Sequence, residues 1–453
     1  MASPIAAAPL KQPPSLPPGW IAGNAYEFRR DPLAYLMRNA RELGDIAMFR
    51  VGPFTAYQFN HPDQIHEVLL GKADQLQKAR IYKRGLSEFL GNGLLISDGA
   101  FWKRQRRLAQ PAFHMKRVNT YADIMVTYTQ DLIKSWHTGQ TINLSDEMMH
   151  VTLRIVAKTL FDTDTSSSSD QVAEALDVML HSVAHFSRGF VRLPAWIPTP
   201  ARRRKRWSIE TLDAIIMQMI QARRASGDDH GDLLSMLMQA RDEDGAAMSD
   251  QQLHDEALTI VLAGHETTAN ALTWTLYLLS QNPEIEARLY EEIQAVLGDR
   301  TATLADVENL VYTEKVVKEG MRLYPPAWSL SRQIIKGADV EIGGYTIPYG
   351  ASVVVSAYVT QRDPRWFPDP ECFDPERFTP EAEKALPRYA YFPFGGGPRI
   401  CIGSSFAMME AKLILATIVQ HHRLAHAPNH KVEMEPLITL RPKHGMEMIV
   451  QGR

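Results

Sequence analysis

The chain has 453 residues and a formal net charge of −3, with 45% hydrophobic and 22% charged residues. This balance is that of an ordinary globular protein, so it argues against disorder, and a net charge so close to zero gives no electrostatic case for nucleic-acid binding. Two cysteines cannot build a disulfide framework, so we expect a reducing, cytoplasmic setting.

The first twenty residues form a proline-rich lead-in, with prolines at positions 13, 14, 17 and 18. This stretch lacks an apolar run of roughly 18 residues, which a membrane-spanning helix needs, and it lacks a basic segment followed by an apolar core. We therefore expect neither a transmembrane segment nor a signal peptide. We expect residues 21–453 to form one domain.

The rest of the chain alternates between residue patterns typical of strands and residue patterns typical of helices. Residues 45–62 carry aromatic and β-branched residues broken by Gly-Pro, which predicts strands. From about residue 100 to about residue 325 the pattern is mainly helical, and residues 339–359 return to strands and turns. The run SSFAMMEAKLILATIVQHH predicts one strong helix near the end. The sequence thus predicts a mainly α fold with a small β portion, which segments from both ends of the chain form together.

The longest predicted helix begins after a capping residue, Ser249, and ends near Gln281, where Asn282-Pro283 stops it. It is apolar on nearly all sides, which places it in a core. Its middle reads AGHETT (263–268), and a glycine with polar residues weakens a buried helix, so we expect these residues to have a use. The alternative is a kink whose polar groups are satisfied within the core.

A specialised loop, FGGGPRICIG, occupies residues 394–403. Its glycines allow backbone conformations closed to other residues and a close approach to a flat ligand. Cys401 lies just before a predicted helix, whose N-terminus favours thiolate over thiol. One thiolate is a poor zinc site, but it suffices as the axial ligand of a haem iron. We expect the other cysteine, Cys372, to be structural.

The stretch FPFGGGPRICIG resembles the haem-binding loop of the cytochrome P450 family, with Phe394, Arg399 and Cys401 at the family's positions. EGMR (319–322) is similar to the family's E-x-x-R element, and AGHETT is similar to its central-helix motif. The resemblance covers nearly the whole chain. It implies the cytochrome P450 fold, a triangular helical domain that holds haem b between the central helix and the helix after the cysteine.

The resemblance also assigns roles to individual residues. It makes Cys401 the axial ligand of the haem iron, places Thr267 beside the bound dioxygen and makes Glu266 the acid of an acid–alcohol pair. A hydroxyl next to a carboxyl can relay protons in a dry pocket. The remaining roles are a structural triad of Glu319, Arg322 and Arg377, and haem-propionate binding by Trp102, Arg106, Arg332 and Arg399. Taken singly, each of these arginines is more often a solvated surface residue.

The resemblance implies a haem-thiolate monooxygenase that inserts one oxygen atom from O2 into a C–H bond of a lipophilic small molecule. No Rossmann-like or flavin-binding motif follows Cys401, so we expect a monomer that receives electrons from NAD(P)H through a separate ferredoxin or flavodoxin with its reductase. Three alternatives stay open: a peroxygenase or isomerase without a redox partner, a non-catalytic haem-binding protein, and a haem-free helical scaffold. Glu266-Thr267 argues against the first two.

By family analogy the substrate pocket is lined by apolar side chains, which indicates a lipophilic substrate. Fatty acids and terpenoids are the two candidate classes, in that order. A cation at the pocket mouth, such as Arg80 or Lys83, would favour a fatty acid. The pocket residues that we expect are Leu94, Phe186, Ala263, Trp328, Leu437 and Ile438.

Overall fold

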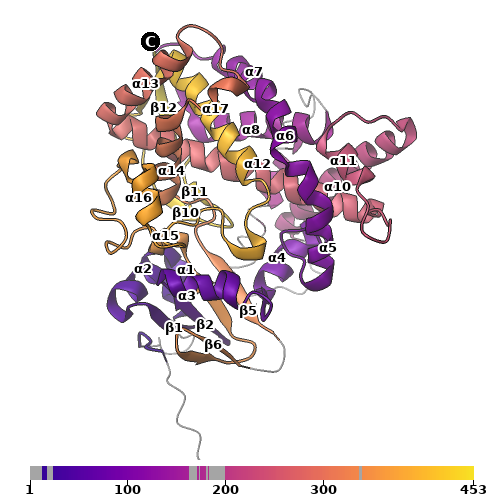
Figure 1. The fold of residues 1–453 in the computed structure, drawn as a ribbon, viewed down its shortest axis with the longest axis vertical. Coiled ribbons are helices and arrows are strands. Elements are labelled where there is room, and N and C mark those ends of the chain that lie inside the picture. Colours follow the sequence, from indigo (N-terminus) through magenta and orange to yellow (C-terminus); the bar gives the residue numbers. More distant parts are fainter. Residues whose placement is uncertain are drawn as a thin grey trace, which may run out of the picture. The chain divides into compact units, whose positions relative to one another are not determined.

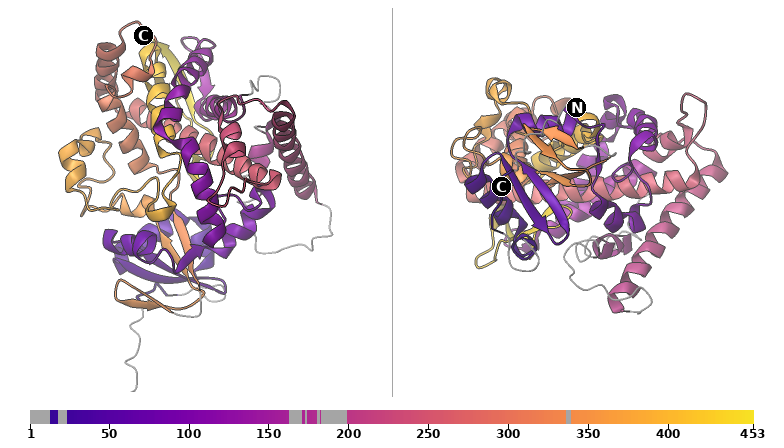
Figure 2. Two further views of the ribbon diagram at one scale, coloured as in Figure 1. Left: turned by 45° about the vertical axis from the view of Figure 1, so that its right-hand side comes forward. Right: turned by 90° about the horizontal axis from the view of Figure 1, so that it is seen from below.

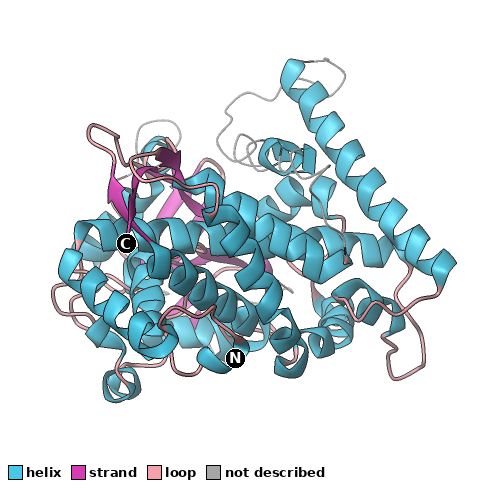
Figure 3. Ribbon diagram, turned by 90° about the horizontal axis from the view of Figure 1, so that it is seen from above, coloured by secondary structure: helices cyan, strands magenta, loops and turns pink. Residues whose placement is uncertain are grey.

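The computed structural model describes residues 13–17, 24–162, 171, 172, 174–179, 182, 199–335 and 339–453. Helices dominate these residues (Figure 3), as the sequence predicts. The backbone divides into two compact units. The smaller unit combines the described parts of Met1–Arg80, Ser329–Pro368 and Leu386–Ile400, and the larger unit combines those of Ile81–Trp328, Asp369–Ala385 and Cys401–Arg453.

The smaller unit is built on a five-stranded sheet in the order β1-β2-β8-β5-β3, visible in both views of Figure 2. β2 pairs antiparallel with β1 and parallel with β8, so residues from the start of the chain lie beside residues about 300 positions later. The strands are β1 (Ile46–Val51), β2 (Phe54–Phe59), β3 (Leu76–Lys78), β5 (Leu330–Ile334), β8 (Ser352–Val355) and the hairpin β6 (Val340–Ile342) with β7 (Tyr345–Ile347).

Short helices cover this sheet. Its buried core includes Phe59, Ile65, Val353 and Val355, which come from distant parts of the sequence. The helical elements are α1 (Ala25–Arg30), α2 (Pro32–Leu43), α3 (Pro62–His66), the π-helical turn η1 (Glu67–Gly71), α15 (Ala357–Thr360) and the 3-10 turn η6 (Gly397–Arg399).

The larger unit is mostly helical. Its strands form the sheets β4-β12-β9 and β10-β11 from β4 (Thr141–Asn143), β9 (His422–His426), β10 (Met434–Pro436), β11 (Leu440–Pro442) and β12 (Glu447–Gly452). Its longer helices are α4 (Arg80–Leu90, which starts at the unit boundary), α5 (Gly99–Ala109), α7 (Ala122–Ile133), α8 (Leu144–Phe161), α10 (Pro200–Ser226), α11 (Leu233–Gln239), α12 (Asp250–Gln281), α13 (Pro283–Leu297), α14 (Val311–Leu323) and α17 (Ser404–His421). Short helical turns are η2 (Gln110–Phe113), α6 (Met115–Val118), η3 (Asn119–Tyr121), η4 (Leu304–Asp306), η5 (Pro375–Phe378) and α16 (Pro380–Ala385).

Helix α12 is the central helix that the sequence predicts. The Ser249 hydroxyl accepts from the amide of Gln252 at 3.2 Å, and the Gln252 side chain accepts from the Ser249 amide at 2.9 Å, so a capping box starts the helix. The helix ends before Asn282 and runs without a break through residues 263–268. It packs against α8, α10, α14 and α17 (Figure 1), which makes it the core element of the larger unit.

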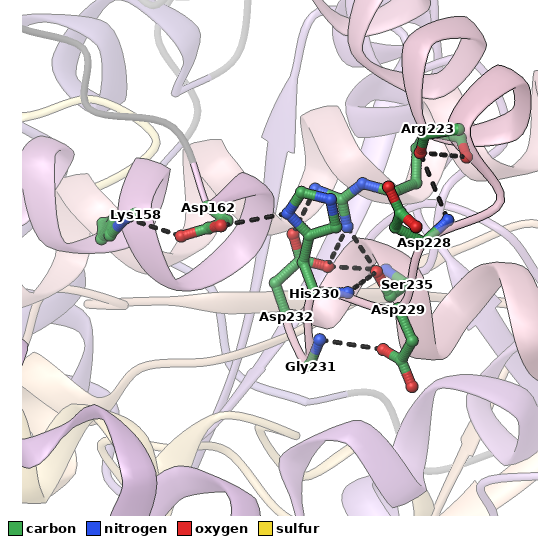
Figure 4. Close-up of polar contacts among 10 residues, drawn as sticks. Lys158, Asp162, Arg223, Asp228, Asp229, His230, Gly231, Asp232 and Ser235 are labelled. Carbon is green, nitrogen blue, oxygen red and sulfur yellow. Dashed lines mark hydrogen bonds and ion pairs between the residues drawn. The ribbon is translucent and has the colours of Figure 1, made fainter.

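A polar cluster joins the ends of α8, α10 and α11 (Figure 4). Asp162, which follows α8, pairs with Lys158 at 2.6 Å and with His230 at 3.0 Å. Arg223 in α10 forms a buried ion pair of 2.7 Å with Asp232, the residue that caps α11. Because α8 and α10 both pack on α12 as well, this cluster fixes the layer of helices around the central helix.

Several sequence expectations need correction or lie outside the described residues. The predicted strand run 339–359 ends in α15. The lead-in is described only at 13–17, where the Pro14 carbonyl accepts from the amide of Met48 at 2.8 Å. Phe186 lies outside the described residues. Within the described ranges, no helix combines the length and apolar character needed to cross a bilayer.

Candidate active site

The glycines before the cysteine are packed tightly within the smaller unit. Gly395 and Gly397 have φ angles of +72° and +63°, which side chains disfavour. A Cβ on Gly397 would lie 1.9 Å from the Leu69 carbonyl oxygen in η1, and one on Gly396 would lie 2.2 Å from the Tyr389 ring. These glycines are therefore required by the packing of the loop on its own unit, a reason that the sequence did not reveal.

Cys401 begins the last segment of the larger unit, and α17 starts at Ser404, as predicted. Its side chain keeps accessible surface, although protein atoms crowd the sulfur. Burial raises the pKa of the Cys401 thiol, while the amide of Gly403 and the guanidinium of Arg106 act to lower it. Burial thus opposes the stabilisation of the thiolate that we expect from the helix N-terminus. A coordinated metal cation would supply the missing stabilisation of the thiolate.

Helix α5 brings a cation to this cysteine. Trp102 is buried and Arg106 is half-buried, one turn apart on the same helix. Burial lowers the pKa of Arg106, and the charge of Cys401 acts in the opposite direction, so the two side chains are electrostatic neighbours. The helix that carries Trp102 and Arg106 thus lies beside Cys401, the expected ligand.

The other expected haem-binding residues belong to the smaller unit. Arg332 is buried on β5, where its guanidinium donates to the Ser331 carbonyl at 3.1 Å. Phe394 and Arg399 are half-buried in the glycine loop.

The middle of α12 has one accessible face. Ala263 is exposed and Thr267 is half-buried, whereas most of their neighbours on the helix are buried. The Thr267 hydroxyl donates to the Ala263 carbonyl at 2.6 Å. The expected reaction-site alcohol therefore faces the accessible side, and its oxygen can still accept a hydrogen bond.

Glu266 lies on a different side of α12 and is buried. The Thr439 hydroxyl donates to its carboxyl at 2.6 Å, and the Asn270 side chain donates to Thr439 at 3.1 Å. Burial raises the pKa of Glu266 to about 7, against the opposing effects of the Thr439 bond and of Arg441. Glu266, the acid of the expected acid–alcohol pair, thus accepts a hydrogen bond from the C-terminal segment.

The sequence did not reveal the hydrogen bond between Thr439 and Glu266, because 173 positions separate the two residues. The neighbours of Thr439 were expected to line the substrate pocket. The Leu437 carbonyl accepts from the indole of Trp328 at 3.1 Å, and Ile438 packs on the core of the larger unit. Leu94, from another part of this unit, is half-buried.

A second buried carboxyl also escaped notice. Glu410 in α17 is fully buried, and burial raises its pKa to about 8, with an opposing contribution from the hydroxyl of Thr268 in α12. Neither MMEAKL nor AGHETT indicates in the sequence that these two residues meet, so only the packing of α12 on α17 reveals the pair.

The expected structural triad forms a connected network in the larger unit. Glu319 and Arg322 are fully buried and share two hydrogen bonds, of 2.7 and 2.8 Å. Arg377 approaches Glu319 at 3.5 Å. Because α14 carries the first two residues and η5 the third, the network ties the segment 369–385 to α14.

Arg322 also binds the segment before η5 directly. Its guanidinium donates to the carbonyls of Pro370 at 2.7 Å and Cys372 at 3.0 Å. The amide of Asp374 donates to Glu319 at 2.8 Å. Each nitrogen of the buried Arg322 guanidinium therefore donates to a partner, as a buried ion pair requires.

Comparison with known proteins decides the family. The cytochrome P450 family profile matches residues 13–448. The chain belongs to the cytochrome P450 family. It is 39% identical to cyclooctatin synthase of Streptomyces melanosporofaciens, over 93% of this chain and 91% of that protein. It is 35% identical to pentalenene oxygenase of Streptomyces avermitilis, over 93% of each protein.

The fold comparison agrees. A solved structure described as the cytochrome P450DA heme domain superposes with a TM-score of 0.89 at 27% identity and covers 98% of both chains. A further relative, cyclooctat-9-en-7-ol 5-monooxygenase of Streptomyces melanosporofaciens, is 36% identical over 94% of each protein. The protein is therefore a cytochrome P450 monooxygenase with the mainly α fold that the sequence predicts.

Membership of this family implies a haem, and the residues present fit one. Cys401 supplies a single cysteine sulfur, and Arg106 supplies a neighbouring positive charge. A thiolate ligand with a nearby cation suits an iron porphyrin whose propionates need basic partners.

Proposed function

We propose that this cytochrome P450 hydroxylates a terpenoid, a cyclic hydrocarbon or its alcohol, at an unactivated C–H bond. The relatives at 35–39% identity are terpenoid-modifying monooxygenases that match more than 90% of the chain. The observation that carries the proposal is the accessible Ala263–Thr267 face of α12, set in a helix whose residues are mostly buried. An uncharged face of this kind suits a ligand without charge.

The other candidate class, fatty acids, finds less support. A fatty acid needs a cation for its carboxylate, and Lys83 was one candidate. Its ammonium pairs with Asp98 at 2.6 Å, so its charge is already balanced. We therefore place terpenoids ahead of fatty acids, which reverses the order expected from the sequence.

We assign the haem, as haem b, to Cys401, whose sulfur would bind its iron, and to Trp102, Arg106, Arg332, Phe394 and Arg399 as the residues that would hold its ring and propionates. When bound, the haem supplies the activation of O2 and the oxidation of the C–H bond. Cys401 contributes the thiolate, whose charge Arg106 and the Gly403 amide help to hold.

The remaining side chains position substrate and move protons. The Thr267 hydroxyl donates a hydrogen bond to the Ala263 carbonyl, and its oxygen can accept a second hydrogen bond at the same time. Glu266, with a pKa of about 7, is close to half-protonated at neutral pH, so it can release and regain a proton with little cost. Trp328, Leu437, Ile438, Leu94 and Ala263 are proposed to contact the hydrocarbon, and Glu319, Arg322 and Arg377 to support the scaffold.

We further propose that electrons come from NAD(P)H through a separate ferredoxin or flavodoxin with its reductase, and that the enzyme acts as a monomer. Product formation should therefore require an added redox partner pair. Product formed from NAD(P)H by the purified enzyme alone would refute this part.

The test of the substrate class is optical. The purified ferric enzyme is titrated with cyclic terpene hydrocarbons, their alcohols and fatty acids of matched carbon number, and the Soret band is followed. We expect a saturable low-spin to high-spin shift with the cyclic compounds, because they displace water near the metal. A saturable shift with the fatty acids alone would overturn the proposal.

A further inference from the structure

The loop at residues 91–97, GNGLLIS, is fastened to the central helix by its backbone. The amide of Asn92 donates to the Asp255 carboxylate at 2.7 Å, and the amide of Leu94 donates to the Glu256 carboxylate at 2.9 Å. Two adjacent acids of α12 thus hold alternate amides of one loop. Hydrogen bonds to ionised acceptors are about twice as strong as neutral ones.

The loop lies directly on the helix. A Cβ on Gly91, whose φ is +52°, would lie 2.2 Å from the Asp255 carboxylate. A Cβ on Gly93 would lie 2.1 Å from the Thr259 hydroxyl and 2.6 Å from the Asp255 carbonyl. Both glycines are therefore needed for this approach, so the contact is a specific fit of backbone to helix.

The acids are themselves held in place. Asp255 accepts from the side chain of Gln251 at 2.8 Å and contacts His254 at 3.2 Å, and His254 reaches Asp213 of α10 at 3.0 Å. Burial alone would raise the pKa of Asp255, but these contacts and the Asn92 amide hold it below its usual value. Asp255 is thus a fixed anion between two helices and the loop.

Glu256 differs from Asp255, because burial raises its pKa to about 7 and the charge of Asp255 adds to the effect. Only the Leu94 amide acts in the opposite direction. The strength of this one hydrogen bond therefore depends on whether Glu256 is ionised.

We call the hydrogen bonds from the Asn92 and Leu94 amides to Asp255 and Glu256 the clamp. Glu256 of this clamp lies on the same side of the helix as the proposed reaction site. Glu256, Ala263 and Thr267 are separated by seven and four residues, spacings that return to one face of an α-helix. Ala263 follows Glu256 by two turns, or about 10 Å along the axis. The loop that Glu256 holds is therefore placed next to the accessible face of α12.

We propose that Glu256, with Asp255, is a positioning residue for substrate: it fixes the loop at 91–97, and with it Leu94, against the face of α12 that carries Ala263 and Thr267. The role of the loop in substrate contact rests on the proposed function. The clamp itself rests on the hydrogen bonds and the two glycines alone. The experiment separates these two levels.

The test uses the haem-loaded enzyme with Glu256→Leu, which removes the acceptor, and Glu256→Gln, which keeps an acceptor but cannot ionise. Glu291→Gln changes an exposed acid on α13 and serves as the control. Hydrogen–deuterium exchange is followed in peptides that cover residues 91–97. We expect roughly tenfold faster exchange in Glu256→Leu, the effect of losing one charge-assisted hydrogen bond, and no change in the control.

Glu256→Gln provides the readout that a purely structural role would not move. After correction for intrinsic rates, the wild-type loop should gain protection between about pH 6 and about pH 8 as Glu256 ionises, and Glu256→Gln should not. His254, Asp255 and Asp213, and the Lys83–Asp98 pair beyond the loop, also face this region, but all of them are retained in this variant. A pH response of equal size in Glu256→Gln would therefore overturn the role of Glu256.

Binding completes the test. A cyclic terpenoid that shifts the spin state should bind roughly fivefold or more weakly to Glu256→Leu, whereas imidazole, which binds the iron directly, should bind within about twofold of wild type. Should no terpenoid bind the wild type, the proposed function fails while the exchange data still decide the clamp. Unchanged exchange in both Glu256 variants would overturn the clamp whatever the substrate proves to be.

Discussion

The Thr439 hydroxyl donates a 2.6 Å hydrogen bond to the Glu266 carboxyl and so joins the C-terminal segment to the central helix, one residue before Thr267. The same segment carries Leu437 and Ile438, two of the proposed substrate contacts. The acid of the proposed proton relay and two of the proposed substrate contacts therefore belong to one hydrogen-bonded structure.

Thr439→Val keeps the shape of this side chain and removes the donor. Because the Thr439 bond lowers the pKa of Glu266, its loss should raise that pKa above 7 by roughly one unit. A more basic Glu266 is protonated in more molecules at neutral pH. We expect the pH profile of product formation to move to higher pH, with more peroxide released per NAD(P)H consumed.

Thr439→Ser is the matched control, because it keeps the hydroxyl and loses one methyl group. It should keep the wild-type pH profile and peroxide yield. A profile that moves equally in both variants would point to altered packing of the segment, and it would contradict a role for the hydrogen bond.

Glu319→Gln tests the buried network around Arg322. The change removes the negative charge and leaves the fully buried guanidinium without its counter-ion. Breaking a buried ion pair from one side typically costs about 3–5 kcal/mol. We expect a large drop in the urea midpoint of the haem-loaded enzyme, whereas Glu308→Gln, at an exposed site, should leave it unchanged. Equal midpoints for the two variants would show that the network does not stabilise the scaffold.

Gly397→Ala tests the crowding of the glycine loop on η1. Alanine here adds strain from the φ of +63° and a clash with the Leu69 carbonyl oxygen at 1.9 Å. Gly344→Ala is a matched control, because its φ is +77° but no atom lies within 4 Å of the added Cβ. We expect Gly397→Ala to lose most of its bound haem, measured as Soret absorbance per protein. Gly344→Ala should keep its haem and lose about 1 kcal/mol of stability.

The fold was predictable because its signals are local. The Ser249 cap, the apolar run of α12 and the Asn282-Pro283 stop lie within one segment, and so do the residues that surround Cys401. The resemblance to the cytochrome P450 family rests on such contiguous motifs, and the comparisons bear it out.

What the sequence could not predict depends on contacts between distant segments. Thr439 meets Glu266 across 173 positions, and the Leu94 amide meets Glu256 across 162. Neither pair has a spacing that a periodicity could reveal. The effect of burial on the Cys401 thiol has the same origin, since the burial that raises its pKa depends on the whole fold.

Glu410 should make the stability of the enzyme depend on pH. Its pKa is about 8 in the folded protein, against an ordinary value of 4.5, so the folded state binds a proton that the unfolded state releases earlier. The stabilisation is fully present below about pH 4.5 and is lost as the pH rises to about 8, a total on the order of 4 kcal/mol. Glu410→Gln, which stays neutral, should abolish this loss.

The measurement is the urea midpoint of the haem-loaded wild type and variants at about pH 5.5 and about pH 8.5. Because Glu266 and Glu256 remain in every variant, their similar contributions cancel, and the difference isolates Glu410. We expect Glu410→Gln to gain on the wild type as the pH rises, and the exposed-site variant Glu291→Gln to follow the wild type. A constant difference between Glu410→Gln and wild type across this range would mean that Glu410 is already ionised in the folded enzyme and that a partner stabilises its charge.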